Sequence, residues 1–301
     1  MKKMISLGFI IAGLINVLPG MSAAAAGLRV VSDQTVTGFV HPESVAYDSQ
    51  AKVLYVSQFG SELKPTLKDG KGKISKTSLT GKVLEETFLP PAGETLNKPK
   101  GIWVQGNRLW VTDIDVVWVF DLKSRRGRKT SLPGVQFAND PTVMGNALFV
   151  SDNRSDQLFR VEPADFLDLK GEPKASVVFV GKSVHPNGLY PGRDGSLLMV
   201  GFKSPKEAKG VYSLGTGGDL KTLSSGLGRL DGIYELDDGS LLVTDWNSGS
   251  LSQWNAKTGM HKLASGFKGP ADFCVVPEAN GLLVVVPDLV KSELRFIRLA
   301  R

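Results

Sequence analysis

The chain has 301 residues, of which 42% are hydrophobic and 22% charged, enough for one large domain or two ordinary ones. Its single cysteine, Cys274, excludes an internal disulfide and sits in an apolar run, where a catalytic thiol is not expected. The formal net charge is +6, and the basic residues are scattered except at 123–129. Because aromatic residues are not interleaved with that run, we interpret it as a solvated turn and expect no nucleic-acid partner.

The first 26 residues predict an export signal. Lys2 and Lys3 precede an apolar stretch from Ile5 to Leu18, and small residues allow cleavage near Ala26. An uncleaved membrane anchor is the alternative, but the apolar stretch is shorter than the roughly 20 residues that span a bilayer. We therefore expect a periplasmic or secreted protein that has no membrane attachment after cleavage.

The rest of the chain repeats itself at intervals of 40 to 57 residues. The repeated stretches are HPESVAYD (41–48), KPKGIWVQ (98–105), ANDPTVMG (138–145), HPNGLYPG (185–192), RLDGIYEL (229–236) and GPADFCVV (269–276). A repeat of this length, with one supersecondary unit in each copy, is typical of solenoids and propellers.

Each repeat contains short runs rich in β-branched and aromatic residues, such as KVLYVSQF and NRLWVTDI. Turn residues separate these runs, as in Asp194-Gly195 and Asp238-Gly239, which suit tight hairpins. The sequence therefore predicts an all-β fold: one domain over residues 27–301, a six-bladed β-propeller with four antiparallel strands in each blade.

Two irregular segments fit this architecture. The last repeat has only three strands before Arg301, while residues 28–36 precede the first repeat without a blade of their own. We predict that this N-terminal strand completes the last blade and closes the ring, which removes two open edges. Residues 61–72 lengthen the first repeat and predict an exposed, mobile loop between the second and third strands of blade one.

The first strand of every blade lines the central channel of a propeller, so the residues that open these strands should meet at one mouth. These residues are Glu43, Lys100, Asp140, Asn187, Asp231 and Asp272. The ends of the second strands should form the surrounding wall, which includes Asp152, Phe202 and Trp246.

Carboxylates crowded into one mouth repel each other unless a cation lies among them. Carboxylate and amide oxygens suit a hard ion such as calcium better than zinc, which prefers His or Cys. The three histidines of the chain do not form a metal-ligand spacing. The alternative is that these residues only form turns and cap the starts of strands.

Four short motifs, in order along the chain, resemble those of the SMP-30/gluconolactonase/regucalcin family, which is related to the diisopropyl fluorophosphatases and paraoxonases. They are Glu43 in HPESV, Asn139-Asp140-Pro141 in FANDP, PNGL at 186–189, and Asp231-Gly232 in LDGIY. The resemblance in architecture covers nearly all of residues 27–301.

The resemblance implies that Glu43, Asn187 and Asp231 bind a divalent cation, with calcium as the first choice, and that Asn139 contacts the metal or the substrate. It also implies hydrolysis of a sugar lactone or related ester, with the cation polarising the carbonyl and Asp231 directing or deprotonating a water. The residues expected to contact the substrate are Asn139, Asp140, Lys100, Asp152, Phe202 and Trp246.

Lys100 departs from the family pattern because it brings a positive charge to the expected cation site. It could hold a carboxylate or hydroxyl of the substrate, lean outward, or neutralise the acidic ring without a metal. The last case favours a second function, that of a non-catalytic propeller of the NHL type that binds a protein, glycan or small ligand on the same face. We interpret His41 and His185 as turn residues, because each lies two residues before a residue that opens an inner strand. The alternative is a role as general base.

Overall fold

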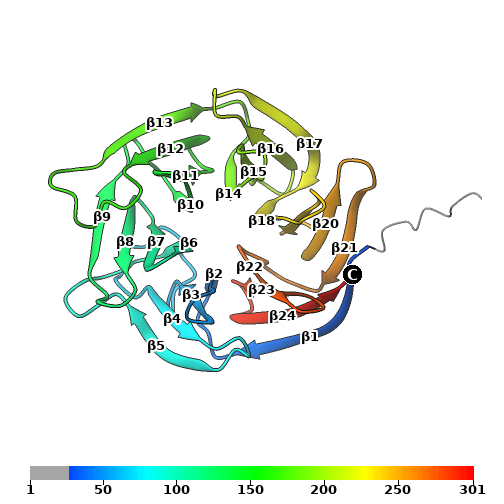
Figure 1. The fold of residues 1–301 in the computed structure, drawn as a ribbon, viewed down its shortest axis with the longest axis horizontal. Coiled ribbons are helices and arrows are strands. Elements are labelled where there is room, and N and C mark those ends of the chain that lie inside the picture. Colours follow the sequence, from blue (N-terminus) through cyan, green and yellow to red (C-terminus); the bar gives the residue numbers. More distant parts are fainter. Residues whose placement is uncertain (1–26) are drawn as a thin grey trace, which may run out of the picture.

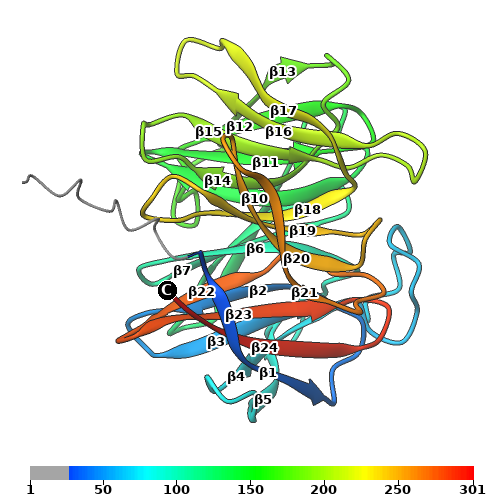
Figure 2. The same cartoon turned by 90° about the vertical axis from the view of Figure 1, so that its right-hand side faces the viewer.

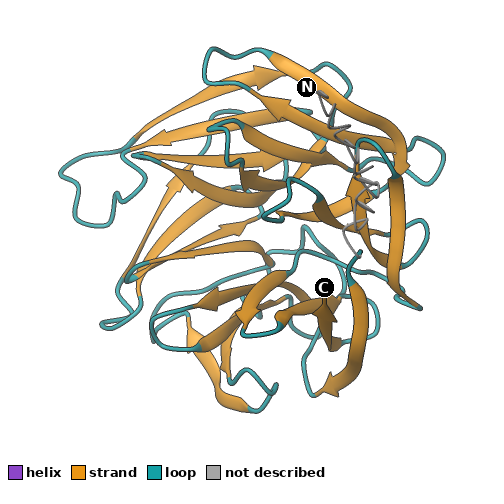
Figure 3. Ribbon diagram, turned by 45° about the vertical axis from the view of Figure 1, so that its right-hand side comes forward, coloured by secondary structure: helices purple, strands orange, loops and turns teal. Residues whose placement is uncertain are grey.

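The computed structural model describes residues 27–301, which form six four-stranded antiparallel sheets in a ring around a central channel (Figure 1). All regular secondary structure in this part of the chain is strand (Figure 3). The predicted all-β, six-bladed propeller is therefore confirmed. The predicted export signal, residues 1–26, lies outside the described residues. Between residues 27 and 301, no helix has the length and apolar character needed to cross a membrane.

The strands follow one order in every blade, from the channel outward. The inner strands are β2 (Pro42–Asp48), β6 (Pro99–Gln105), β10 (Ala138–Met144), β14 (Pro186–Pro191), β18 (Leu230–Glu235) and β22 (Cys274–Glu278). The second strands are β3 (Val53–Gln58), β7 (Arg108–Asp113), β11 (Ala147–Asp152), β15 (Leu197–Gly201), β19 (Leu241–Asp245) and β23 (Gly281–Asp288). The third strands are β4 (Lys73–Thr77), β8 (Val116–Asp121), β12 (Gln157–Glu162), β16 (Lys209–Leu214), β20 (Ser250–Asn255) and β24 (Glu293–Ala300). The outer strands are β5 (Val83–Leu89), β9 (Gly127–Ser131), β13 (Lys174–Val180), β17 (Leu220–Gly228), β21 (Gly259–Ser265) and β1 (Arg29–Thr37).

Blade six is built from both ends of the described chain, as predicted. Strand β1 pairs antiparallel with β24, so that Arg29 lies opposite Ala300 and Thr37 lies opposite Glu293 (Figure 2). Residues 61–72 connect β3 to β4 and are mostly exposed, which also agrees with the prediction.

Six clusters of the hydrophobic core each lie between two adjacent blades, and a small seventh cluster contains Phe59, Ala271 and Leu289. The second strands supply both sides of these clusters because alternate residues of a strand point in opposite directions. In β3, Val53 and Tyr55 pack toward blade two, whereas Leu54 and Val56 pack toward blade six. Burial on both faces explains why these strands are almost continuously apolar in the sequence.

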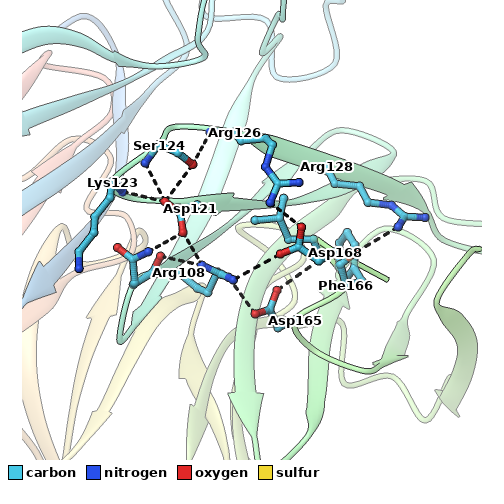
Figure 4. A network of polar contacts seen from close by, with 11 residues as sticks. Arg108, Asp121, Lys123, Ser124, Arg126, Arg128, Asp165, Phe166 and Asp168 are labelled. Atoms are coloured by element: carbon cyan, nitrogen blue, oxygen red, sulfur yellow. Dashed lines mark hydrogen bonds and ion pairs between the residues drawn. The ribbon is translucent and has the colours of Figure 1, made fainter. Parts of the chain in front are cut away.

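Ionic contacts join blades two and three at their outer edges (Figure 4). Arg108 lies 2.6 Å from Asp121 of β8 and 2.8 Å from Asp165, which follows β12. Arg126 pairs with Asp168 at 2.5 Å, and Arg128 donates to the carbonyl of Phe166 at 3.2 Å. The basic run at 123–129 therefore contains arginines that make intramolecular contacts, Arg126 from the turn before β9 and Arg128 from β9 itself.

Four of the second strands end in an aspartate that anchors the inner strand of the same blade. Its carboxylate accepts hydrogen bonds of 2.6 to 3.0 Å from backbone N–H groups of the segment that enters the inner strand. The pairs are Asp113 with Asn97 and Lys98, Asp152 with Gln136 and Phe137, Asp245 with Arg229, and Asp288 with Lys268 and Gly269.

We predict that Asp288→Ala strongly destabilises the fold. The buried carboxylate of Asp288 also accepts from the backbone of Val290 and Lys291, so its loss leaves several N–H groups without their acceptor. The expected cost is about 3 kcal/mol, or a melting temperature lower by roughly 6–12 °C. Asp194→Ala is the control, because Asp194 is exposed and accepts one backbone bond, from Ser196. Equal melting temperatures of the two variants would contradict the proposed anchoring role.

Candidate functional site

Four oxygen-bearing side chains meet at one end of the channel, and each is the second residue of an inner strand. They are Glu43 of β2, Asn139 of β10, Asn187 of β14 and Asp231 of β18. The pairing register of these inner strands shifts at this point, as in a β-bulge. The same shift occurs at the start of β6, whose second residue is Lys100. A bulge re-aims a side chain, and in these five strands it affects residues at the same strand position.

These side chains are buried, and some of their polar atoms have partners. Asn139 donates from Nδ2 to Oδ1 of Asn187, and Trp246 donates from Nε1 to Oδ2 of Asp231 at 2.8 Å. The Oε2 atom of Glu43 is also buried, but it has no hydrogen-bond partner within residues 27–301. A buried carboxylate oxygen without a donor is costly, so this atom indicates a place for a ligand.

Burial raises the pKa of the channel carboxyl groups. For Glu43 the pKa lies well above its usual value because of burial and then the charge of Asp231, while Lys100 partly lowers it. Burial and the charge of Asp272 raise the pKa of Asp231 to about 8. Burial raises the pKa of Asp272 to about 7, although a hydrogen bond from Ser44 opposes this shift. Each ionised carboxylate of this set therefore disfavours the next in the absence of a cation.

The donor set fits a hard divalent cation. Two carboxylates and two amides offer oxygen ligands, and the unpartnered Glu43 oxygen belongs to this set. Between residues 27 and 301, no group of three or more His, Cys, Asp and Glu side chains could hold a metal ion. A site of this chain at the channel mouth must therefore include amide oxygens, which suits calcium better than zinc.

A cavity of about 510 Å³ opens above these four residues. Aromatic rings of Phe59, Phe137, Phe202 and Trp246 form much of its wall, and Phe202 and Trp246 meet edge to face at 5.5 Å. The remaining lining residues are Pro65, Asn153, Arg154, His185, Lys203 and Leu289. The cavity thus combines an oxygen-rich floor, apolar walls and a rim with basic side chains.

The loop at 61–72 reaches this cavity through Pro65. Lys98, which is fully buried, holds the loop by donating from Nζ to Asp69 at 2.8 Å and to the carbonyl of Phe59 at 2.8 Å. The loop is exposed as predicted, and the Lys98–Asp69 ion pair ties it to the channel side of blade two.

The structure distributes the sequence-predicted residues over two ends of the channel. Glu43, Asn139, Asn187, Asp231, Phe202 and Trp246 line the 510 Å³ cavity. Asp140 and Asp272 instead line a smaller cavity of about 170 Å³, together with Tyr47, Trp103, Tyr190 and Tyr234 near the other ends of the inner strands. In blade three the expected opening residue, Asp140, is thus displaced by one: Asn139 faces the mouth, because neighbouring strand residues point in different directions.

Asp152 and Lys100 do not line the larger cavity either. The carboxylate of Asp152 is fully buried and accepts backbone N–H groups of Gln136, Phe137, Arg154 and Ser155, so it shapes the turns of blade three. The ammonium of Lys100 is buried beneath the site, 3.2 Å from the carbonyl of Lys98 and 4.2 Å from the ring centroid of Phe137. Burial lowers the pKa of Lys100 to about 8, which Asp113 and Glu43 oppose.

His41 and His185 occupy equivalent turns, as their spacing predicts. Both have φ near +51° and come directly before an inner strand, and their carbonyls accept the N–H groups of Phe59 and Phe202. His185 also lines the cavity, where its Nδ1 contacts the carbonyl of Asn153 at 2.7 Å and its Nε2 contacts Lys203 at 2.7 Å. Both ring nitrogens of His185 therefore have partners. Cys274 is buried, and burial raises the pKa of its thiol.

Phe59, Phe137, Arg154 and Lys203 were not predicted as site residues. A usable signal exists for Phe59, because the residue after the second strand lines the cavity in five blades: Phe59, Asn153, Phe202, Trp246 and Leu289. Phe137 has a related signal, since it directly precedes an inner strand, like His41 and His185. Arg154 and Lys203 lie one residue further into their turns, where the sequence pattern does not indicate a direction.

No family model matches the sequence, and no curated protein is similar to it in sequence. Solved structures are similar in fold. A streptogramin B lyase has a TM-score of 0.62 at 13% identity, covering 89% of this chain and 97% of its own. A protein described as a candidate gluconolactonase has a TM-score of 0.61 at 16% identity, covering 92% and 93%. The virginiamycin B lyase of Staphylococcus aureus has a TM-score of 0.57 at 14% identity, covering 90% and 100%. At these identities the similarity shows the propeller fold alone.

We predict that the metal-free protein loses stability as the pH rises from about 4 to about 8. In this range the folded protein keeps a proton on Asp231, whose pKa is raised to about 8, while the unfolded chain has released it. Protons bound only by the folded state make its stability fall with increasing pH. Thermal melts in chelator should show a steeper decline for the wild type than for Asp231→Asn. Parallel pH profiles of the two proteins would contradict the raised pKa.

Proposed function

We propose that the protein is an exported, divalent-cation-dependent hydrolase of a lactone or related ester, with calcium at the channel mouth. The observation that carries this proposal is the set of Glu43, Asn139, Asn187 and Asp231 at one strand position in four blades, with one buried Glu43 oxygen that lacks a partner in the described chain. The fold it shares with a candidate gluconolactonase and with streptogramin B lyases is compatible with an enzyme of this kind.

In this proposal Glu43, Asn187 and Asp231, with Asn139 beside them, hold the cation. When bound, it supplies positive charge that polarises the carbonyl oxygen of the substrate. The bond from Trp246 to Oδ2 orients the carboxylate of Asp231, which would hold a water molecule on the floor of the cavity. Asp231 accepts a proton from that water, whose oxygen adds to the carbonyl carbon. The acyl C–O bond then breaks, the proton passes to the leaving oxygen, and the product is a hydroxy acid or an acid and an alcohol.

The cavity suits a small organic substrate in size and lining. A volume of about 510 Å³ lies within the usual range of ligand pockets, which are mostly apolar with a few polar groups. Of the residues expected to contact substrate, Asn139, Phe202 and Trp246 line this cavity, which supports the proposal. The edge-to-face pair of Phe202 and Trp246 offers an apolar surface to the carbon skeleton of a substrate.

The predicted export signal is consistent with a calcium site of modest affinity. Calcium modules outside the cytosol bind with dissociation constants of roughly 10⁻⁴–10⁻³ M. We therefore place the protein in the periplasm or outside the cell, where a site of two carboxylates and two amides would be occupied.

A second candidate function is a non-catalytic propeller that binds a ligand at the same mouth. Lys100 favours it, because its charge acts on Glu43 and could balance the acidic floor without a metal. This candidate predicts no cation binding at the mouth.

The first test is a thermal melt of chelator-treated protein, titrated with calcium, magnesium, manganese and zinc. At a calcium concentration about 100 times its dissociation constant, the melting temperature should rise by roughly 5 °C or more. Glu43→Gln and Asp231→Asn should lose this shift, whereas Asp194→Asn should keep it, because Asp194 is exposed in the turn after β14 and does not line the cavity. If none of the four cations raises the melting temperature, the result favours the non-catalytic binding propeller.

The catalytic part of the proposal is tested with a panel of lactones and esters in calcium. Asp231→Asn should lower kcat/KM about 100-fold or more, since it removes the proton acceptor. Turnover that is unchanged by chelator and by Asp231→Asn would contradict the proposed mechanism.

Lys100→Met separates the two candidates further. Removing a buried positive charge that acts on Glu43 should tighten calcium binding by about tenfold if calcium lies at this site. Isothermal titration calorimetry gives the dissociation constants directly. If Lys100→Met has the melting temperature of the wild type but binds calcium more weakly, calcium does not bind at the channel mouth.

A further inference from the structure

One side of the cavity is basic, and the proposed mechanism does not use it. Arg154, in the turn between β11 and β12, and Lys203, after β15, both line the cavity. They belong to neighbouring blades, three and four, so their charges lie on the same side of the channel mouth. The lining residues of opposite charge are Glu43 and Asp231 on the floor, which are the proposed cation ligands.

Arg154 is held in place but its charge is not paired. Its guanidinium lies 4.2 Å from the ring centroid of Phe137, which fixes the side chain against the cavity wall. The side chain is exposed and forms no ion pair with any residue between 27 and 301. The same ring is contacted from the buried side by Lys100, whose pKa Arg154 helps to lower. An anion at Arg154 would relieve this repulsion.

Lys203 is oriented by His185. Nδ1 of His185 lies 2.7 Å from a carbonyl oxygen and must donate to it, so Nε2 accepts from the ammonium of Lys203 at 2.7 Å. An ammonium has three N–H donors, and this bond uses one of them. Oε2 of Glu207 forms an ion pair with the same ammonium at 3.7 Å, while Oε1 of Glu207 accepts from Lys209 at 2.6 Å, so at most two of the three donors of Lys203 are used. Lys203 therefore keeps donor capacity toward the cavity.

We propose that Arg154 and Lys203 form a binding subsite for a carboxylate group of the substrate. The planar guanidinium matches a carboxylate, and a neighbouring ammonium adds a charge-assisted hydrogen bond. This inference rests on the proposed function and names its substrate class: a lactone or ester that carries a carboxylate away from the reacting carbonyl. The carbonyl lies on the oxygen-rich floor, the apolar part lies against Phe202 and Trp246, and the carboxylate reaches the basic side.

The test compares γ-valerolactone with 5-oxotetrahydrofuran-2-carboxylate, in which a carboxylate replaces the methyl group of the same ring. In the presence of calcium the wild type should show a kcat/KM at least tenfold higher for the carboxylate lactone. Arg154→Ala and Lys203→Ala should each reduce this preference by roughly tenfold, and added salt should reduce it in the wild type. Lys206→Ala is the matched control, because Lys206 is exposed on the same loop and does not line the cavity.

Calorimetric binding of the same two lactones, with and without calcium, separates this inference from the proposed function. Selective binding of the carboxylate lactone that is lost in Arg154→Ala, without turnover, supports the subsite and contradicts the hydrolase. Turnover of both lactones at equal kcat/KM, or a preference unchanged in Arg154→Ala and Lys203→Ala, overturns the subsite and leaves the hydrolase standing. Neither binding nor turnover of either lactone contradicts both.

Discussion

The geometry of the site depends on how the start of each inner strand is fixed. In four blades an aspartate at the end of the second strand accepts the backbone N–H groups that enter the inner strand. Blade one uses Gln58, which accepts from Val40 at 2.6 Å. Blade four uses Asp156 of the preceding blade, which accepts from His185, because its own second strand ends at Gly201. A side chain at Gly201 would collide with the carbonyl of Val184, so the anchor must come from elsewhere.

Much of the fold could be predicted from the sequence because the propeller repeats two local constraints. Second strands are buried on both faces and therefore stay apolar along their length, as in LYV of β3 and LLMV of β15. Their terminal aspartates mark where a blade returns to the channel mouth. The six repeated stretches that open the inner strands set the number and phase of the blades, and the N-terminal strand was recognised because the last repeat lacked one strand.

The site was predicted less completely, and blade three shows why. In FANDP two polar residues follow each other, and periodicity cannot decide which one faces the mouth. The bulge at the start of β10 decides it in favour of Asn139, while Asp140 accepts the N–H of Leu189 at 2.7 Å. The prediction that Asp152 contacts substrate is not supported, for a related reason. A carboxylate at a strand end can face a cavity or anchor a turn, and the sequence does not show the backbone N–H groups that Asp152 accepts.

The partners of the channel carboxyl groups distinguish the end with the smaller cavity from the end that borders the larger cavity. Asp272 accepts from Ser44 at 2.6 Å and Asp140 accepts from Leu189, so the acids at the far end are supported by the fold. Glu43 keeps a buried oxygen without a donor in the described chain, while Asp231 and the two amides beside it border an open cavity. The four residues at strand position two are fixed by the ladder and the bulges, whereas Arg154 and Lys203 lie in turns that the ladder does not constrain. The floor of the cavity therefore follows from the fold, whereas the proposed carboxylate subsite depends on turn residues that can change without altering a blade.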